Sequence, residues 1–162
     1  MFKIKLSILL LTNLLIISCI KNEDLQNTPK FRIGYIPGEY DGLILKNYLS
    51  SYLKIKRLYD IKSPLEIRAS VSHEGNLYIT NIDNTSDREK ITSTLSVVIR
   101  DTISECTIFE NKETLSQFYI FASSDLFLSN KTAAKEITKS NTEELVKGLL
   151  RKINKIDLSC NE

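Results

Sequence analysis

The segment REKITSTLSVVIRDT, residues 88–102, alternates between apolar and polar side chains. Successive side chains of a β-strand point to opposite faces, so every second residue would share one face. That face would carry Ile91, Ser93, Leu95, Val97 and Ile99. The β-branched content also favours a strand. We therefore predict a long strand with one apolar face, followed by a turn near residues 102–105.

Two other segments are expected to pair with this strand. Residues 64–73, PLEIRASVSH, alternate strictly and predict a half-buried strand. Residues 106–121, CTIFENKETLSQFYIF, follow the turn and are the expected antiparallel partner. Residues 74–87 hold many turn-forming side chains, so we expect a long or partly extended loop there. A shorter strand is expected at the start of KFRIGYIPG, residues 30–38, before Pro37 and Gly38 stop it.

Two segments have helical periodicity. Residues 40–55 repeat apolar side chains at intervals of three and four, and Asp41 is the expected N-cap. The apolar stripe of this helix is Leu45, Tyr48, Leu49, Tyr52 and Leu53. Residues 130–153 show the same period, with Ser140 and Glu143 placed as in a capping box. The C-terminal segment is therefore either one long helix or two.

The order of these elements is strand, helix, three strands, helix. It predicts an α+β fold: a four-stranded, mostly antiparallel sheet with two helices packed on it. Without residues 1–18 the chain would have 144 residues and equal numbers of basic and acidic side chains. That length suits one domain with an ordinary core. Because this shorter chain would have no net charge, we do not expect it to be a general nucleic-acid-binding protein.

The N-terminal residues have the pattern of an export signal. Residues 1–18 combine a basic start with a short apolar run and a small residue, Ser18, before Cys19. The run is too short to cross a bilayer comfortably. The last four positions, Ile16-Ile17-Ser18-Cys19, match the lipobox of bacterial lipoproteins, in which the cysteine thiol carries a diacylglycerol and the peptide is cut before it. We predict a signal peptide at residues 1–18, a covalent lipid on Cys19 and a polar tether over residues 19–30. The alternative is an uncleaved membrane anchor with an incidental cysteine.

Several acyl chains on one protein would hold it on a membrane almost permanently. Residue 20 is Ile rather than Asp, the usual inner-membrane retention signal of enterobacteria, so we expect the periplasmic side of the outer membrane. In an exported protein, Cys106 and Cys160 are candidates for one disulfide. Their positions in an expected turn and an expected tail leave that bridge open.

The sequence contains no recognisable catalytic motif. His73 is the lone histidine, which excludes a histidine-rich metal site, and we expect no metal. Its place at the end of an expected strand favours a surface histidine over a catalytic one. The sequence contains no G-x-S-x-G motif and no Gly-rich phosphate loop. We predict a protein that is not an enzyme and needs no cofactor beyond the lipid on Cys19.

Binding residues are more plausible at one end of the expected sheet. Arg88 and Lys90 begin a strand, and Lys131 precedes the last helix. Together such cations hold phosphate groups, although three of them on a neutral protein are more often solvated. The run FYIF, residues 118–121, lacks polar alternation. It is either a strand end buried on both faces or a surface that a partner covers.

Four segments together resemble the LPS-assembly lipoprotein LptE family, particularly its alphaproteobacterial members. They are FRIGYIPGEYDGLILKNYLSSYL with Leu45, Asn47 and Leu49, then LEIRASVS, then DREKITSTLSVVIRD, and lastly SQFYIFASSDLFLSNKTAAKEI with Tyr119, Ser124, Phe127 and Ala133. The resemblance covers most of residues 31–155, so we assign residues 31–156 to one LptE-like domain and residues 157–162 to a tail. The chain departs from the family in lacking Gly-Phe after the lipid cysteine. It also lacks the usual Gly in the turn at Ser104-Glu105-Cys106.

The resemblance implies a specific role. Members of the family plug the lumen of the outer-membrane β-barrel LptD, assist its assembly and help to place lipopolysaccharide in the outer leaflet. In this chain Arg88, Lys90 and Lys131 would bind the lipid A phosphates. One rival is another envelope lipoprotein, an adaptor with a small α+β domain and a different partner. A second rival, an anchored enzyme, is disfavoured by the missing catalytic set.

Overall fold

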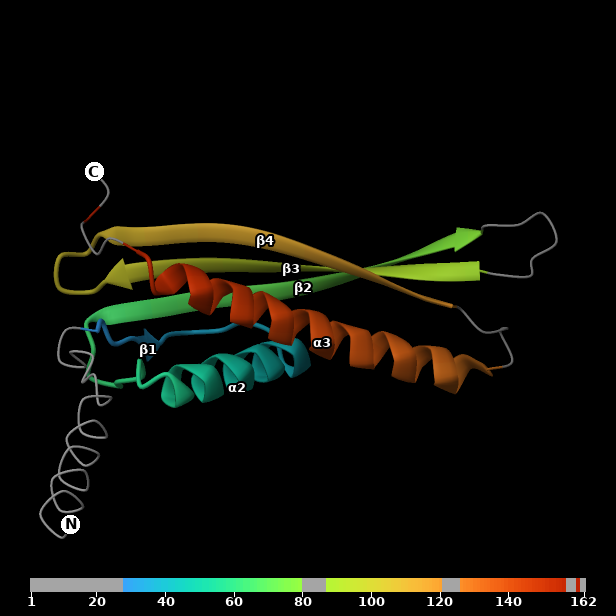
Figure 1. Cartoon of the computed structure of the whole chain (residues 1–162), viewed down its shortest axis with the longest axis horizontal. Coiled ribbons are helices and arrows are strands. Elements are labelled where there is room, and N and C mark those ends of the chain that lie inside the picture. Colours follow the sequence, from blue (N-terminus) through green and yellow to red (C-terminus); the bar gives the residue numbers. More distant parts are fainter. Residues whose placement is uncertain (1–27, 80–86, 121–125, 157–159, 161–162) are drawn as a thin grey trace, which may run out of the picture.

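The computed structural model describes residues 28–79, 87–120, 126–156 and 160. The expected signal peptide, Cys19 and most of the tether and tail lie outside the described residues. The elements are β1 (Arg32–Ile33), α2 (Tyr40–Ile55), β2 (Leu65–Ile79), β3 (Asp87–Asp101), β4 (Thr107–Ile120) and α3 (Phe127–Ile153) (Figure 1). This order is the α+β arrangement that the sequence predicts.

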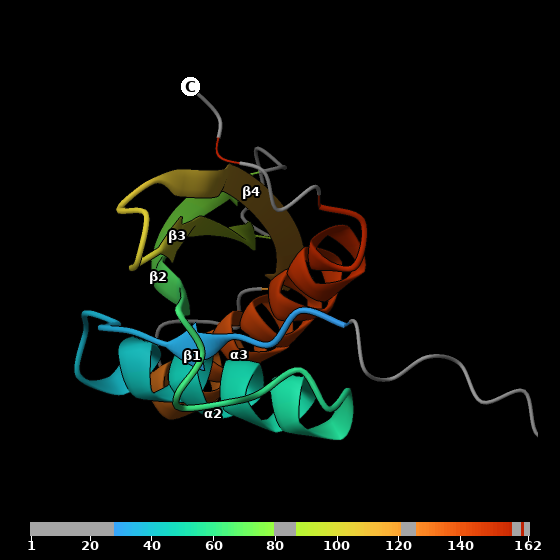
Figure 2. The ribbon, with the colours of Figure 1, turned by 90° about the vertical axis from the view of Figure 1, so that its left-hand side faces the viewer.

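The sheet has the order β1-β2-β3-β4. The short strand β1 runs parallel to β2, with Arg32 opposite Glu66, and the other two pairs are antiparallel. Both helices cover the same face of the sheet, α2 next to β2 and α3 across β3 and β4 (Figures 1 and 2). The other face of the sheet is not covered by any element of the described residues. In those residues, none of the helices is long and apolar enough to cross a bilayer.

The core lies between the sheet and the helices, where the alternation places it. The predicted apolar face of β3, from Ile91 to Ile99, is buried throughout. The stripe of α2 packs against it, with Leu45, Leu49 and Leu53 fully buried. The helix α3 contributes Leu145, Leu149 and Ile153 to the same cluster. The repeat of apolar residues at every second position in the strands, and at nearly every fourth position in the helices, therefore identifies the core correctly.

Two predicted helix caps are wrong. The helix α2 begins at Tyr40, so Asp41 lies in its first turn rather than at the N-cap. The helix α3 is continuous over 27 residues, so Ser140 and Glu143 lie inside it and form no capping box. Glu143 instead accepts a 2.6 Å hydrogen bond from the Tyr52 hydroxyl of α2. Glu143 thus forms a hydrogen bond between the two helices and not the local bond of a capping box.

The expected loop after His73 is partly wrong as well. The strand β2 continues to Ile79 and pairs with β3 residue by residue to its end. His73 is thus in the middle of a strand and faces the helices. Its side chain is only 10% exposed, so it is not a surface histidine. The long β2–β3 pair carries one end of the sheet away from β1 and α2 (Figure 1).

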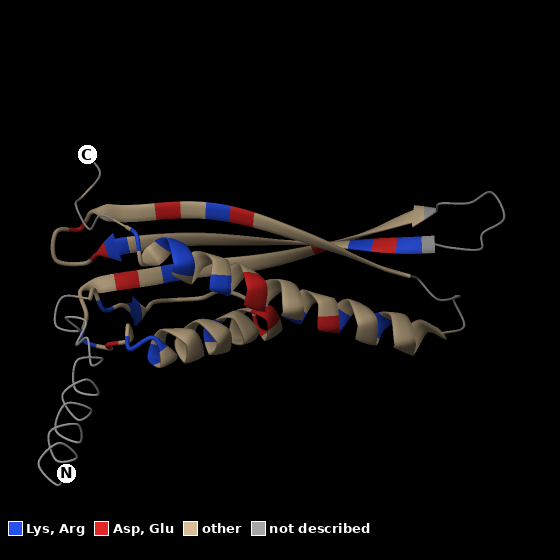
Figure 3. Cartoon of the chain, in the orientation of Figure 1, with Lys and Arg blue, Asp and Glu red and all other residues tan. Residues whose placement is uncertain are grey.

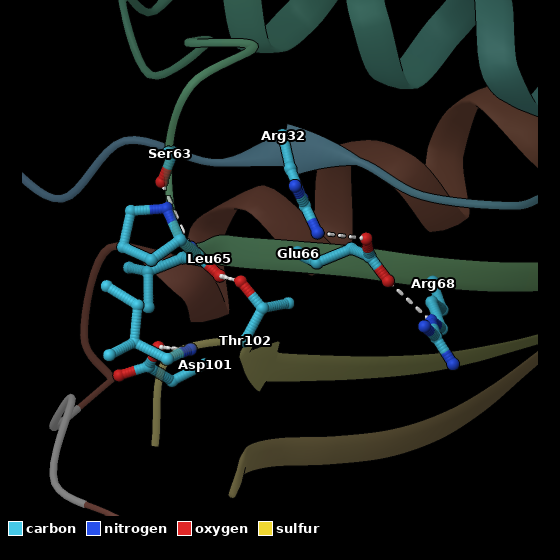
Figure 4. A network of polar contacts seen from close by, with 9 residues as sticks. Arg32, Ser63, Leu65, Glu66, Arg68, Asp101 and Thr102 are labelled. Carbon is cyan, nitrogen blue, oxygen red and sulfur yellow. Dashed lines mark hydrogen bonds and ion pairs between the residues drawn. The ribbon is translucent and has the colours of Figure 1, made fainter. Parts of the chain in front are cut away.

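The opposite end, which we call the entry end, holds the start of the described chain, the C-terminus of α2 and the β3–β4 turn (Figure 1). A polar network fastens it (Figure 4). Glu66 accepts hydrogen bonds from Arg32 (2.7 Å) and Arg68 (2.5 Å). These bonds, that from Arg68 foremost, lower the pKa of the Glu66 carboxyl. The Thr102 hydroxyl donates to the Pro64 carbonyl at 2.9 Å, which ties the β3–β4 turn to the start of β2.

Candidate functional site

The far end of the sheet, which we call the tip, brings cations and aromatic rings onto one face. Arg88 of β3 lies opposite Tyr78 of β2 and Ile120 of β4. Lys90, two residues on, lies opposite Phe118. Because Ile91 and its alternates face the helices, these residues belong to the uncovered face. We define the tip by its residues Tyr78, Arg88, Lys90, Phe118 and Ile120.

The side chains of the tip contact one another. The Lys90 ammonium lies 5.8 Å from the centroid of the Phe118 ring, and the Tyr78 and Phe118 centroids are 6.0 Å apart. Phe118 is nevertheless 57% exposed and Ile120 is 73% exposed. The described part of FYIF is therefore not buried on both faces, because no helix or further strand among the described residues covers this side of β4. Phe121 lies outside the described residues.

The face beneath the tip is held by a hydrogen bond between strands. Tyr119 points to the helix side and donates its hydroxyl hydrogen to Glu89 on β3. Burial, reinforced by this hydrogen bond, raises the pKa of the Tyr119 hydroxyl. The strand pair that carries Arg88, Lys90 and Phe118 is thus fixed from below, while its outer side chains remain accessible.

Lys131 lies on a different element from the two strand cations. Contrary to the prediction, it does not precede the last helix but is exposed in the second turn of α3. The start of α3 lies at the same end of the molecule as the tip (Figure 1), and cations and acids are distributed along α3 (Figure 3). Among the described residues, no hydrogen bond or ion pair joins Lys131 to Arg88 or Lys90. Next to it, the start of α3 exposes the three apolar side chains of Leu126, Phe127 and Leu128. The three predicted cations therefore form one close pair and one separate charge, all beside exposed apolar groups.

Exposed apolar side chains beside cations are chemically suited to an anionic amphiphile. The cations would bind acidic oxygens, and the rings and aliphatic groups would contact hydrocarbon. Among the described residues, no three His, Cys, Asp or Glu side chains gather as a metal site would require. The tip offers binding surface rather than a set of acids, bases or nucleophiles.

The two other predicted cysteine positions lie at the entry end. Cys106, in the turn before β4, is joined to Cys160 by a disulfide with the Cα atoms 5.8 Å apart. The bridge links the last part of the chain to the sheet. Cys19, the predicted lipid attachment point, lies outside the described residues.

The sequence pattern predicts no binding role for Tyr78 or for the exposed residues at the start of α3, although Phe127 belongs to the family resemblance. Gly75 and Asn76 interrupt the strand pattern, so the sequence predicts a loop at Tyr78. The signal that could have identified the others was the run Leu126-Phe127-Leu128 before a helix with polar neighbours. Three consecutive apolar side chains at the start of a helix stay exposed unless another element packs against them.

No protein-family profile and no curated protein matches the sequence. The fold, however, is shared with solved structures of proteins named as lipoproteins. A minor lipoprotein from Acinetobacter baumannii superposes with a TM-score of 0.60 at 14% identity, over 82% of this chain and 96% of that one. The rare lipoprotein B from Shewanella oneidensis also gives 0.60, at 9% identity over 75% and 92% of the two chains. Lipoprotein B from Nitrosomonas europaea gives 0.55, at 14% identity over 78% and 82%.

Proposed function

We propose that this chain is an envelope lipoprotein, anchored through Cys19 at the periplasmic side of the outer membrane. There it plugs an LptD-type β-barrel, helps the barrel to assemble and assists lipopolysaccharide on its way to the outer leaflet. The observation that carries the proposal is the fold, which this chain shares over 82% and 75% of its length with two structures named as lipoproteins. The lipobox ending at Cys19 and the LptE-like segments support it from the sequence.

The tip is the part of the domain that we assign to lipopolysaccharide. Lipid A presents phosphates beside acyl chains, and the tip presents Arg88 and Lys90 beside Phe118 and Ile120. Arg88 would donate paired hydrogen bonds to a phosphate, whereas Lys90 would act as a point charge. Lys131 would contact a second acidic group from α3. The protein would act by binding and scaffolding, without making or breaking a bond.

The partner can be tested by isolating the C-terminally tagged protein from gently solubilised membranes. Electrophoresis of boiled and unboiled samples would then reveal a bound β-barrel by its heat-modifiable migration. A large barrel in about equal amount is the expected result. Recovery of the protein alone, or with soluble proteins, would contradict the plug and favour the adaptor with a different partner.

Lipopolysaccharide binding can be tested on the same preparation with charge-reversed variants. The double variant Arg88→Glu/Lys90→Glu should bind lipopolysaccharide about tenfold or more weakly, since two charge-assisted contacts are lost. Lys46→Glu/Lys112→Glu is the matched control with the same change of net charge. Lys46 is exposed on α2, and Lys112 is exposed opposite Ser96 on the same sheet face, away from the tip. Equal loss in the tip variant and the control would show that the tip has no special role.

A further inference from the structure

The entry end carries a second cluster of exposed cations and aliphatic side chains. It consists of the last turn of α2 and the loop that follows: Lys54, Ile55, Lys56, Arg57, Ile61 and Lys62. We call this cluster the basic-aliphatic patch. Ile55 and Ile61 are each 71% exposed, and all four cations are exposed. The acidic residue inside this segment, Asp60, accepts a hydrogen bond from the Lys62 backbone N–H at 2.9 Å.

The cations of this patch are free to meet an external partner. Lys56, Arg57 and Lys62 form no ion pair within the described residues. Lys54 lies 5.4 Å from the centroid of the Tyr59 ring and likewise forms no ion pair within the described residues. The two exposed isoleucines are unfavourable in water, whereas the four cations are hydrated there but attract lipid phosphates. The surface of an anionic bilayer suits both kinds of group.

The backbone beneath the patch is fixed rather than loose. Arg57 has a φ of +59° and ends α2 where glycine would ordinarily stand. Its N–H donates to the Lys54 carbonyl, and the Leu58 N–H donates to the Leu53 carbonyl at 2.8 Å. A residue held in this left-handed conformation costs free energy that glycine would avoid. Retaining an arginine here places one more cation on the patch.

The patch is also the place where the chain enters the domain. Phe31 donates its N–H to the Leu58 carbonyl at 2.7 Å and accepts a hydrogen bond from the Asp60 N–H at 3.0 Å. The hydroxyl of Ser63 donates to the Lys30 carbonyl. Residues 30 and 31 are thus bound directly to the segment 58–63, which contributes Ile61 and Lys62 to the patch. Cys19 precedes Thr28 by nine residues, which can span at most about 30 Å.

From this juxtaposition we propose that the basic-aliphatic patch docks on the anionic phospholipid surface in which the chain is anchored. The inference rests on the proposed lipid anchor at Cys19 and goes beyond it. The tether alone would leave the domain free to rotate. The docked patch orients it, with Ile55 and Ile61 entering the headgroup region and the four cations against lipid phosphates. The tip, at the other end of the sheet, then points away from that surface.

The test uses the full processed chain with its own anchor, reconstituted in vesicles of phosphatidylcholine with or without phosphatidylglycerol. A fluorophore is placed at Ile61→Cys on the patch or, as the matched control, at Ser129→Cys, an exposed position at the start of α3. Brominated lipids quench fluorophores that reach the bilayer. Co-flotation with the vesicles, measured on the same samples, reports the anchor independently.

We expect quenching at position 61 but not at position 129, and only in the anionic vesicles. Lys56→Glu/Lys62→Glu should abolish this quenching without affecting flotation, as should high salt. Lys112→Glu/Lys135→Glu, with the same change of net charge outside both the patch and the predicted lipopolysaccharide-binding residues, should leave it intact. Flotation with position 61 no more quenched than position 129 would overturn the docking proposal alone. Absence of flotation would show that the chain is not lipid-anchored, and the docking proposal would then fail together with the proposed anchor.

Discussion

His73 and Ser93 lie directly opposite each other on β2 and β3, with His73 Nδ1 2.8 Å from Ser93 Oγ. Ser93 is fully buried and also accepts a 2.9 Å hydrogen bond from Asn141 Nδ2 of α3. One hydroxyl therefore links two strands and the long helix. The carbonyl oxygen of the buried Asn141 side chain has no hydrogen-bond partner within the described residues. Asn141 Nδ2 also donates to the Ile91 carbonyl, but at 3.5 Å, so the polar site in the core depends mainly on Ser93.

Replacing Ser93 by alanine should destabilise the fold by about 2–3 kcal/mol, since His73 and Asn141 would both lose a buried partner. The free energy of unfolding in urea measures this directly. Thr94→Ala is the control, because Thr94 bonds to Thr114 at an exposed site on the other face. The loss there should be below about 1 kcal/mol. Equal losses at the two positions would show that burial of the site is unimportant.

His73 should make stability fall in mild acid. Burial lowers the pKa of its imidazole, and Asp41, 4.0 Å from Nε2, only partly opposes the shift. The unfolded chain therefore binds a proton at a higher pH than the folded one, and stability rises with pH over that interval. The contribution of neutral His73 is complete above the ordinary histidine pKa and is lost as the pH falls below it.

This pH dependence can be isolated by comparing the protein with His73→Gln between about pH 5 and 8, the range in which histidine titrates. The unfolding free energy of the parent should decline more steeply toward pH 5 than that of the variant. Parallel curves would mean that the imidazole titrates as it does in the unfolded chain.

The disulfide between Cys106 and Cys160 should contribute about 2–4 kcal/mol, since it closes a loop that contains β4 and α3. Cys160→Ser should lower the urea midpoint of the oxidised protein by a corresponding amount. With a reducing agent present, parent and variant should unfold at the same urea concentration. A difference that persists after reduction would have to come from something other than the bridge.

Arg57→Gly should stabilise the fold by about 0.5–1 kcal/mol, because glycine adopts the left-handed conformation at little cost. The neighbouring Lys56→Gly has the opposite expectation. Lys56 has a helical conformation, in which glycine is unfavourable by about 0.5–1 kcal/mol. Thermal unfolding of the pair tests the prediction through the sign of each shift. A decrease for Arg57→Gly would indicate that the arginine side chain stabilises the fold.

Much of the architecture was predictable because burial follows periodicity. Ile91 to Ile99 and the leucines of α2 are core residues for that reason. The end of β2 was not predictable, since Gly75 and Asn76 have low strand propensity. Their pairing with Ile91 and Lys90 in the antiparallel ladder outweighs it. Similarly, the Ser140–Glu143 cap was predicted from local pattern, whereas Glu143 is engaged by Tyr52, a residue far away in the chain.

The site was predictable in part. Arg88 and Lys90 could be predicted as binding residues because they are charged and begin a strand. Their aromatic neighbours could not, because these depend on the register in which the strands pair. The contact of Lys90 with Phe118 exists because β3 and β4 pair those two positions. A shift of one residue in that pairing would have put Phe118 on the helix side. The sequence contains the residues of the tip, and only the alignment of the strands brings them together.

The length of the β2–β3 pair has a consequence for how far the domain can reach. Each strand has 15 residues, which at 3.3 Å per residue makes a ribbon about 50 Å long. A lipid bilayer with its headgroups is only about 40–45 Å thick. A domain docked through its entry end therefore holds Arg88 and Phe118 about one bilayer thickness away from the surface in which the chain is anchored. The rigid ladder lets the tip meet molecules well beyond the lipid headgroups without any part of the protein having to travel to them.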